Sequence, residues 1–174
     1  MTAQFQNSLV DIDALPQIEN LEFIPIDRNY LKVSLISRIL IITIGAIAPV
    51  LFIHFNEEIS YDALPIIGGA YVVLMTTSIT LLRMGFKKKK YALREKDIIY
   101  TKGLIWSVRT AIPFNRIQHA EIKQGPLERK FNLSSLKVFT AGGQSSDLMI
   151  PGLPSEKAQQ LKDFVLGKTA EDGE

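Results

Sequence analysis

The amino-acid sequence predicts a membrane helical hairpin of two spans, followed by an α+β domain in which a curled antiparallel β sheet or barrel is capped by a C-terminal helix. Three observations carry this prediction: two long apolar runs, a series of short runs with a period of two residues, and a final apolar stripe at helical spacing. The expected boundaries are 1–32 for an N-terminal segment, 33–86 for the hairpin, 87–168 for the domain and 169–174 for a flexible tail.

The apolar runs extend from Val33 to Phe55 and from Leu64 to Phe86. Each has roughly 20 residues, the length at which a helix crosses a hydrocarbon core about 30 Å thick. The only charges within the runs, Arg38 and Arg83, lie near one end. Two buried core helices of a soluble protein are the alternative. Two uninterrupted runs followed by a run of lysines favour membrane spans instead.

Small residues within both runs would let the two helices approach closely. They are Gly45, Ala46 and Ala48 in the first run and Gly68, Gly69 and Ala70 in the second. Neither run has an ionisable residue at mid-span. This argues against ion or proton transport, which requires polar groups at membrane depth.

The distribution of charge around the runs predicts their orientation. The connecting loop carries Glu57, Glu58 and Asp62 without any Lys or Arg, whereas the outer flanks are basic and include the run from Lys87 to Lys90. Lys and Arg near the ends of spans mark the cytoplasmic side of a membrane. We therefore expect both termini in the cytoplasm and the acidic loop outside.

The pattern in the second half of the chain predicts short strands rich in Val, Ile, Tyr and Phe, separated by turn residues. The expected strands are Lys89 to Leu93, Ile98 to Lys102, Ser107 to Pro113, Ile117 to Lys123, Leu136 to Thr140 and Asp147 to Ile150. A short helical turn is expected over 125–132, closed by Asn132, which tolerates a left-handed conformation. We expect the strands to form one antiparallel meander.

A final helix is expected from Ser155, which can cap its N-terminus. Its apolar stripe consists of Ala158, Leu161, Phe164 and Val165, and it should end at Gly167. The stripe predicts that this helix packs against the sheet and closes its open end.

Composition excludes several chemistries. The chain has no cysteine, so thiolate catalysis, disulfides and Cys-ligated metals are absent. Its two histidines, His54 and His119, are expected on opposite sides of the membrane, and the Gly142-Gly143 stretch lacks the lysine of a phosphate loop. We therefore predict no enzyme, with no catalytic, cofactor-binding or metal-binding residue, no cofactor and no small-molecule substrate. Nucleic-acid binding is not expected either, because the basic run adjoins the membrane.

The central part of the domain resembles the bacterial pleckstrin-homology-like (PH-like) domain. The residues that carry the resemblance are Gly103-Leu104-Ile105, Ile112-Pro113-Phe114, Arg116-Ile117-Gln118, Gln124-Gly125-Pro126-Leu127, Arg129, Phe131, Leu133 and Thr140-Ala141-Gly142. Two spans followed by one such domain resemble the YdbS-like family of small membrane proteins. Asn132 departs from the pattern, which has Gly after the Phe. The resemblance implies a multi-pass protein of the bacterial plasma membrane, often encoded beside a larger relative with several such domains.

Two surfaces are candidate sites. Basic residues around the first strands are candidate contacts for lipid headgroups: Lys87, Lys88, Lys89, Lys90, Arg94 and Lys96. Glu95 and Asp97 interrupt this set, so general attraction to anionic lipid is expected rather than recognition of one headgroup. The alternative is that the lysines only stop translocation.

The second surface is the strand connection with Leu104, Ile105 and Trp106, together with Arg109. Three large apolar residues at a turn most simply cover the core of the domain. They would otherwise dip into the membrane interface or dock against a partner.

The function favoured by these patterns is a membrane-anchored, non-enzymatic adaptor, whose PH-like domain binds another PH-like membrane protein. The alternative is a component that binds anionic lipid or senses envelope stress. The lipid bilayer is a predicted partner in both cases.

Overall fold

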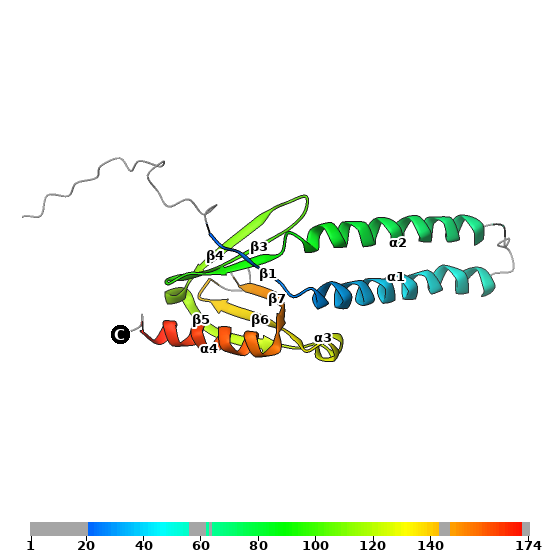
Figure 1. Ribbon diagram of the computed structural model, residues 1–174. Coiled ribbons are helices and arrows are strands. Elements are labelled where there is room, and N and C mark those ends of the chain that lie inside the picture. The colour runs from blue at the N-terminus through cyan, green and yellow to red at the C-terminus, as the bar shows by residue number, and fades with distance from the viewer. Residues whose placement is uncertain (1–20, 56–61, 63, 143–146, 172–174) are drawn as a thin grey trace, which may run out of the picture.

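The computed structural model describes residues 21–55, 62, 64–142 and 147–171. Two long helices, α1 (Asn29–Phe55) and α2 (Leu64–Phe86), lie side by side and project from one end of a β domain (Figure 1). Both are long and apolar enough to cross a membrane, with hydropathies of 2.3 and 1.7 over their most apolar windows. This confirms the predicted hairpin. The acidic loop with Glu57 and Glu58 lies outside the described residues.

Polar side chains connect the two helices. The Arg38 Nη1 atom donates a hydrogen bond to Ser78 Oγ over 3.1 Å, and the hydroxyls of Thr43 and Tyr71 lie 3.1 Å apart. The expected role of the small residues is not supported at the glycines: a Cβ atom built on Gly45, Gly68 or Gly69 would meet nothing within 4 Å. These glycines therefore make no close contact with the neighbouring helix.

The β domain contains two antiparallel sheets rather than the single meander that we predicted. The first has the order β1 (Ile24–Pro25), β2 (Lys90–Leu93), β3 (Asp97–Lys102) and β4 (Val108–Pro113), and the second has the order β5 (Ile117–Lys123), β6 (Leu133–Thr140) and β7 (Leu148–Pro154). The 3₁₀ turn η3 (Phe114–Arg116) separates them. Pro113 has no N–H for a strand ladder, and the side chain of Phe114 is fully buried, so the chain changes sheets here.

The predicted strands all occur, but two extend at one end by three residues or more beyond the expected bounds. β6 begins at Leu133 rather than Leu136, and β7 continues to Pro154 rather than ending at Ile150, because the added residues pair with one another. The helical turn appears as α3 (Pro126–Lys130), and Asn132 has the predicted positive φ, at 52°. The turn from Gly143 to Ser146 lies outside the described residues.

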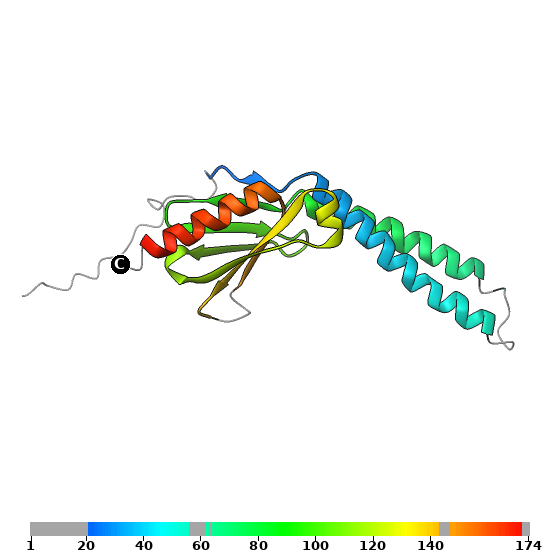
Figure 2. The same ribbon diagram turned by 90° about the horizontal axis from the view of Figure 1, so that it is seen from below.

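The final helix, α4 (Ser155–Glu171), lies along the β domain (Figure 2). Ala158, Leu161 and Val165 are buried in the core as predicted. Phe164 is partly exposed and meets the ring of Phe114 edge to face, with centroids 5.9 Å apart. The core lies between the two sheets and this helix.

The expected end of α4 at Gly167 is wrong. The helix continues through Gly167 to Glu171, so the first residues of the expected flexible tail are helical. The Thr169 hydroxyl donates a hydrogen bond to the Val165 carbonyl over 2.8 Å. It also lies 3.4 Å from the carbonyl oxygen of Phe114. The contact with Phe114 ties the last turn of the helix to the rest of the domain.

The segment before α1 belongs to the first sheet, which the sequence did not predict. In β1, Ile24 pairs with Tyr91 of β2, and Ile26 is buried. Asp27 then donates its backbone N–H to the Gly152 carbonyl over 2.9 Å, while its carboxylate accepts the Asn29 N–H over 2.7 Å at the start of α1. The domain is thus built from residues on both sides of the hairpin.

Candidate functional site

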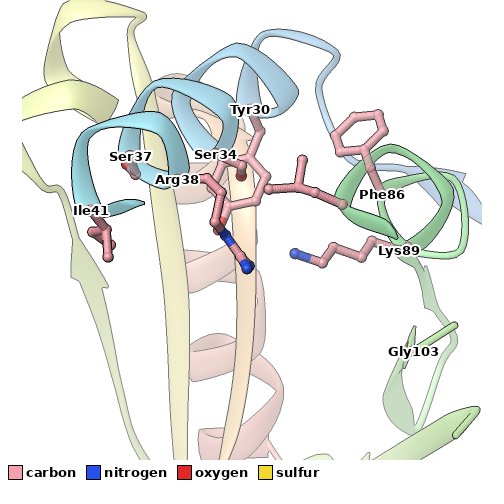
Figure 3. A pocket seen from close by; sticks show the side chains of 10 residues that line it. Tyr30, Ser34, Ser37, Arg38, Ile41, Phe86, Lys89 and Gly103 are labelled. Atoms are coloured by element: carbon pink, nitrogen blue, oxygen red, sulfur yellow. The ribbon is translucent and has the colours of Figure 1, made fainter. Parts of the chain in front are cut away.

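A cavity of about 400 Å³ lies where the two helices meet the domain (Figure 3). Its walls come from the first turns of α1, the last turn of α2, the segment before β2 and the turn after β3. The lining residues are Tyr30, Ser34, Ser37, Arg38, Ile41, Leu82, Gly85, Phe86, Lys89 and Gly103.

Arg38 reaches this cavity from α1. Residues 39–55 continue the helix for about 25 Å beyond it, which is close to the thickness of a hydrocarbon core. Arg38 therefore lies at the level where the apolar part of the span begins. A long basic side chain at such a position keeps its charged group on the polar side of the interface.

Lys89 enters the same cavity just after the end of α2. Figure 3 shows the side chains of Arg38 and Lys89 directed toward each other. The Lys89 ammonium lies 5.1 Å from the centroid of the Tyr30 ring, a cation–π distance. Burial lowers the pKa of Lys89 from its usual value, and the charge of Lys102 lowers it further.

The electrostatics of the cavity favour an anion. Two cationic side chains converge, and none of the lining residues is acidic. An anion between the guanidinium and the ammonium would accept hydrogen bonds from both and offset the cost of holding a lysine charge in partly dehydrated surroundings.

The other predicted lipid contacts are divided among different places. Lys87 and Lys88 are exposed beside the domain end of α2. The Lys90 ammonium lies 4.3 Å from the ring centroid of Phe23, and the Arg109 guanidinium carbon lies 5.8 Å from the same centroid. These two cations therefore hold the N-terminal segment against the first sheet.

Arg94 and Lys96 are not brought to the cavity. They lie in the turn between β2 and β3. The length of β2, at 3.3 Å per residue, places this turn roughly 13 Å from Lys89. Arg94 forms two hydrogen bonds to the Asp97 carboxylate, one from Nε to Oδ1 over 2.6 Å and one from Nη2 to Oδ2. This pairing raises the pKa of Arg94 and occupies its guanidinium.

The connection between β3 and β4 does not cover the core, contrary to the simplest expectation. Ile105 is 80% exposed and Trp106 is 83% exposed. Leu104 instead lies against the last turn of α2, where its Cβ atom is 3.9 Å from the position of a Cβ added to Gly85. The loop thus presents two large apolar side chains beside the domain end of a span.

The remaining polar clusters are structural. Gln124 donates from Nε2 to the Leu133 carbonyl over 2.8 Å, and the Gly125 N–H donates to Glu128 Oε2 over 2.8 Å, so the motif at the center of the resemblance shapes α3 and the start of β6. His119 is exposed and stacks on Phe139, with ring centroids 5.7 Å apart. Within the described residues, no three His, Asp or Glu side chains form a group that could hold a metal ion.

Sequence reasoning missed the cavity because its walls come from distant parts of the chain. Arg38 was noted only as a charge near the end of a span, Gly103 only as part of the family motif, and Tyr30 gave no signal. One feature could have indicated the site. Arg38 and the lysine run lie at the same end of two antiparallel spans, so they are expected at a similar depth relative to the membrane.

Comparison with known proteins agrees with this architecture. The family model described as Bacterial PH domain matches residues 33–169. The chain is 28% identical over 136 residues to UPF0699 transmembrane protein YdbS of Bacillus subtilis (strain 168), covering 78% of this chain and 82% of that relative. It is 23% identical over 129 residues to UPF0699 transmembrane protein YdbT of the same organism, covering 72% of this chain but only 25% of the longer relative. No solved structure gives a significant match.

Proposed function

This chain belongs to the bacterial PH domain family, and we propose that it is a membrane-anchored, non-enzymatic protein that binds the phosphate of an anionic lipid headgroup between Arg38 and Lys89. The observation that carries the proposal is the convergence of these two cations in a cavity with no acidic lining residue. The sequence predicted only general attraction to anionic lipid, whereas the proposal is a specific contact with one headgroup phosphate.

The location of the cavity supports a lipid ligand. It lies at the domain ends of both helices, where headgroups of a surrounding bilayer would be found. Basic pockets between transmembrane helices bind anionic headgroups. An arginine guanidinium matches two phosphate oxygens, and a lysine ammonium adds a compact charge.

The orientation that we propose follows from the same charges. Arg83 and the run from Lys87 to Lys90 lie at the domain end of the hairpin, so the positive-inside rule assigns the domain and both termini to the cytoplasmic side of the bacterial plasma membrane. A single cysteine introduced at Ser60, which lies outside the described residues, should then react with an impermeant reagent added from outside. Labelling only from the cytoplasmic side would reverse the orientation.

The lipid site can be tested by displacement of a fluorescent phosphatidylglycerol from the purified chain in neutral detergent. Arg38→Gln and Lys89→Gln should each weaken binding by about five-fold or more, since a basic residue near a lipid surface contributes about 1 kcal/mol. Lys96→Gln is the matched control, because Lys96 is exposed in the distant turn between β2 and β3. Equal losses in all three variants would show only diffuse charge attraction.

An adaptor is the second candidate function, with another PH-like membrane protein as the partner. A cavity of about 350 Å³ between the spans supports it, since the walls are mainly apolar and include Ala46, Ile47 and Gly68. Packing of a further helix at small residues would fill such a space. The relative YdbT is much longer than this chain, since the match covers only 25% of it, and a partner with several PH-like domains would have a similar length. Gly68→Leu should then reduce co-purification of a membrane partner and leave binding of phosphatidylglycerol unchanged.

A further inference from the structure

We propose that the tip of the β3–β4 hairpin, residues 103–107, is a third membrane attachment, which inserts Ile105 and Trp106 into the headgroup region of the leaflet nearest the domain. This inference does not depend on the lipid phosphate site. It concerns how the domain is held against the bilayer.

The conformation of the tip is defined by its backbone. Gly103 has a φ of +103°, and a Cβ atom added there would lie 1.8 Å from the Trp106 carbonyl oxygen. The turn is thus closed tightly over its own backbone, which directs Ile105 and Trp106 outward. They are the two most exposed large apolar side chains of the described part of the domain, at 80% and 83%.

The position of the tip identifies what covers it. Leu104 lies against Gly85 in the last turn of α2, and Gly103 lines the cavity together with Phe86. Both ribbon views show the hairpin directed toward the domain ends of the helices (Figures 1 and 2). Because the apolar part of α2 ends in this turn, a bilayer around the spans would place its headgroups at the level of the tip.

The chemistry of the tip fits the lipid interface rather than a purely aqueous or purely apolar partner. Tryptophan is enriched at membrane interfaces, where its ring is buried and its N–H remains near water. Lys102 and Arg109 flank the tip in the strands, and basic residues beside an apolar anchor add attraction to anionic lipid. We therefore assign the bilayer, and not a second protein, as the occupant of this surface.

The composition of the chain gives a direct assay, because Trp106 is its only tryptophan. The full chain is reconstituted alone in vesicles of phosphatidylglycerol and phosphatidylcholine. We expect blue-shifted emission that iodide quenches weakly and that lipids brominated near the headgroup quench strongly. Red-shifted emission with ready quenching by iodide and none by brominated lipid would overturn the proposal. Shielding from iodide without quenching by brominated lipid would also overturn it, since the cover would then be protein.

Two variants sharpen this result. Ile105→Asp should increase quenching of Trp106 by iodide several-fold and reduce quenching by brominated lipid, with an unchanged circular dichroism spectrum, because a charge beside the ring opposes insertion. The matched control combines Trp106→Phe with Glu95→Trp, which moves the probe to the exposed turn at the far end of β2. Its emission should be accessible to iodide. If the relocated tryptophan behaves like Trp106, the lipid contact is not specific to the hairpin tip.

Discussion

Gly152 is the point at which the domain docks onto α1, and its replacement by alanine provides a quantitative test of that docking. Its φ is +68°, and a Cβ atom built there would lie 2.5 Å from Cγ of Tyr30 and 2.6 Å from its Cβ. The Gly152 carbonyl also accepts the Asp27 N–H over 2.9 Å. Gly152→Ala therefore introduces both an unfavourable backbone angle and a collision with the first turn of α1.

The two costs can be estimated separately. A left-handed conformation costs a residue with a Cβ about 1–2 kcal/mol. Forcing an added methyl group against a packed side chain costs about 1–3 kcal/mol. Gly152→Ala should thus lower the free energy of unfolding of the domain by about 2–5 kcal/mol.

Urea denaturation of the detergent-solubilised full chain, followed by circular dichroism, measures this change. In a Tyr30→Gly background both colliding atoms are removed and only the backbone cost remains, so Gly152→Ala should then cost about 1–2 kcal/mol. Gly167→Ala is the control, because a Cβ atom there meets nothing within 4 Å, and it should be neutral or slightly stabilising. The same loss in both Tyr30 backgrounds would refute the docking of α1 on β7.

Three further predictions concern the core and the cavity. Leu161→Asp should destabilise the domain by several kcal/mol because it buries a charge against the sheets, whereas exposed Gln160→Asp should be nearly neutral; equal melting temperatures for the two variants would mean that α4 does not pack as described. Thr101→Val should raise the free energy of unfolding by about 1 kcal/mol, since within the described residues the buried Thr101 hydroxyl has no hydrogen-bond partner; a loss of stability in urea denaturation would indicate that this hydroxyl is satisfied. The affinity for phosphatidylglycerol should be full at neutral pH and fall as pH rises through the lowered pKa of Lys89, at a lower pH than for an ordinary lysine, while Lys89→Arg should retain binding at alkaline pH. The same alkaline loss in Lys89→Arg would exclude Lys89 as the titrating group.

Local patterns predicted most of the elements. The second apolar run, Leu64 to Phe86, coincides with α2, because a span is a continuous stretch whose ends are marked by polar residues. The strand Ile117–Lys123 was also predicted at its observed bounds. The family was predictable from motifs around Gly125, where the side chains of Gln124 and Glu128 form hydrogen bonds to the backbone at α3 and the start of β6.

The elements that were missed depend on contacts between distant parts of the chain. Ile24 and Pro25 are too few to show a strand period, and they form β1 only by pairing with β2 across the whole hairpin. The helix beyond Gly167 similarly depends on a tertiary contact, that of Thr169 with Phe114.

The candidate site shows the same limit. Lys89 and Lys96 are close in sequence, so they were grouped, but β2 carries Lys96 away from the membrane end of the domain. Arg38 is distant in sequence, yet it enters the same cavity as Lys89. Residues that share a charge pattern share a site only if the fold returns them to one place.

Native mass spectrometry of the full chain, released from detergent containing phosphatidylglycerol and phosphatidylcholine, tests the central claim most directly. We expect one tightly retained phosphatidylglycerol per chain in the unmodified protein and in Lys96→Gln. The double variant Arg38→Gln and Lys89→Gln should retain none and keep its circular dichroism spectrum. Undiminished retention of phosphatidylglycerol by that folded double variant would contradict the account.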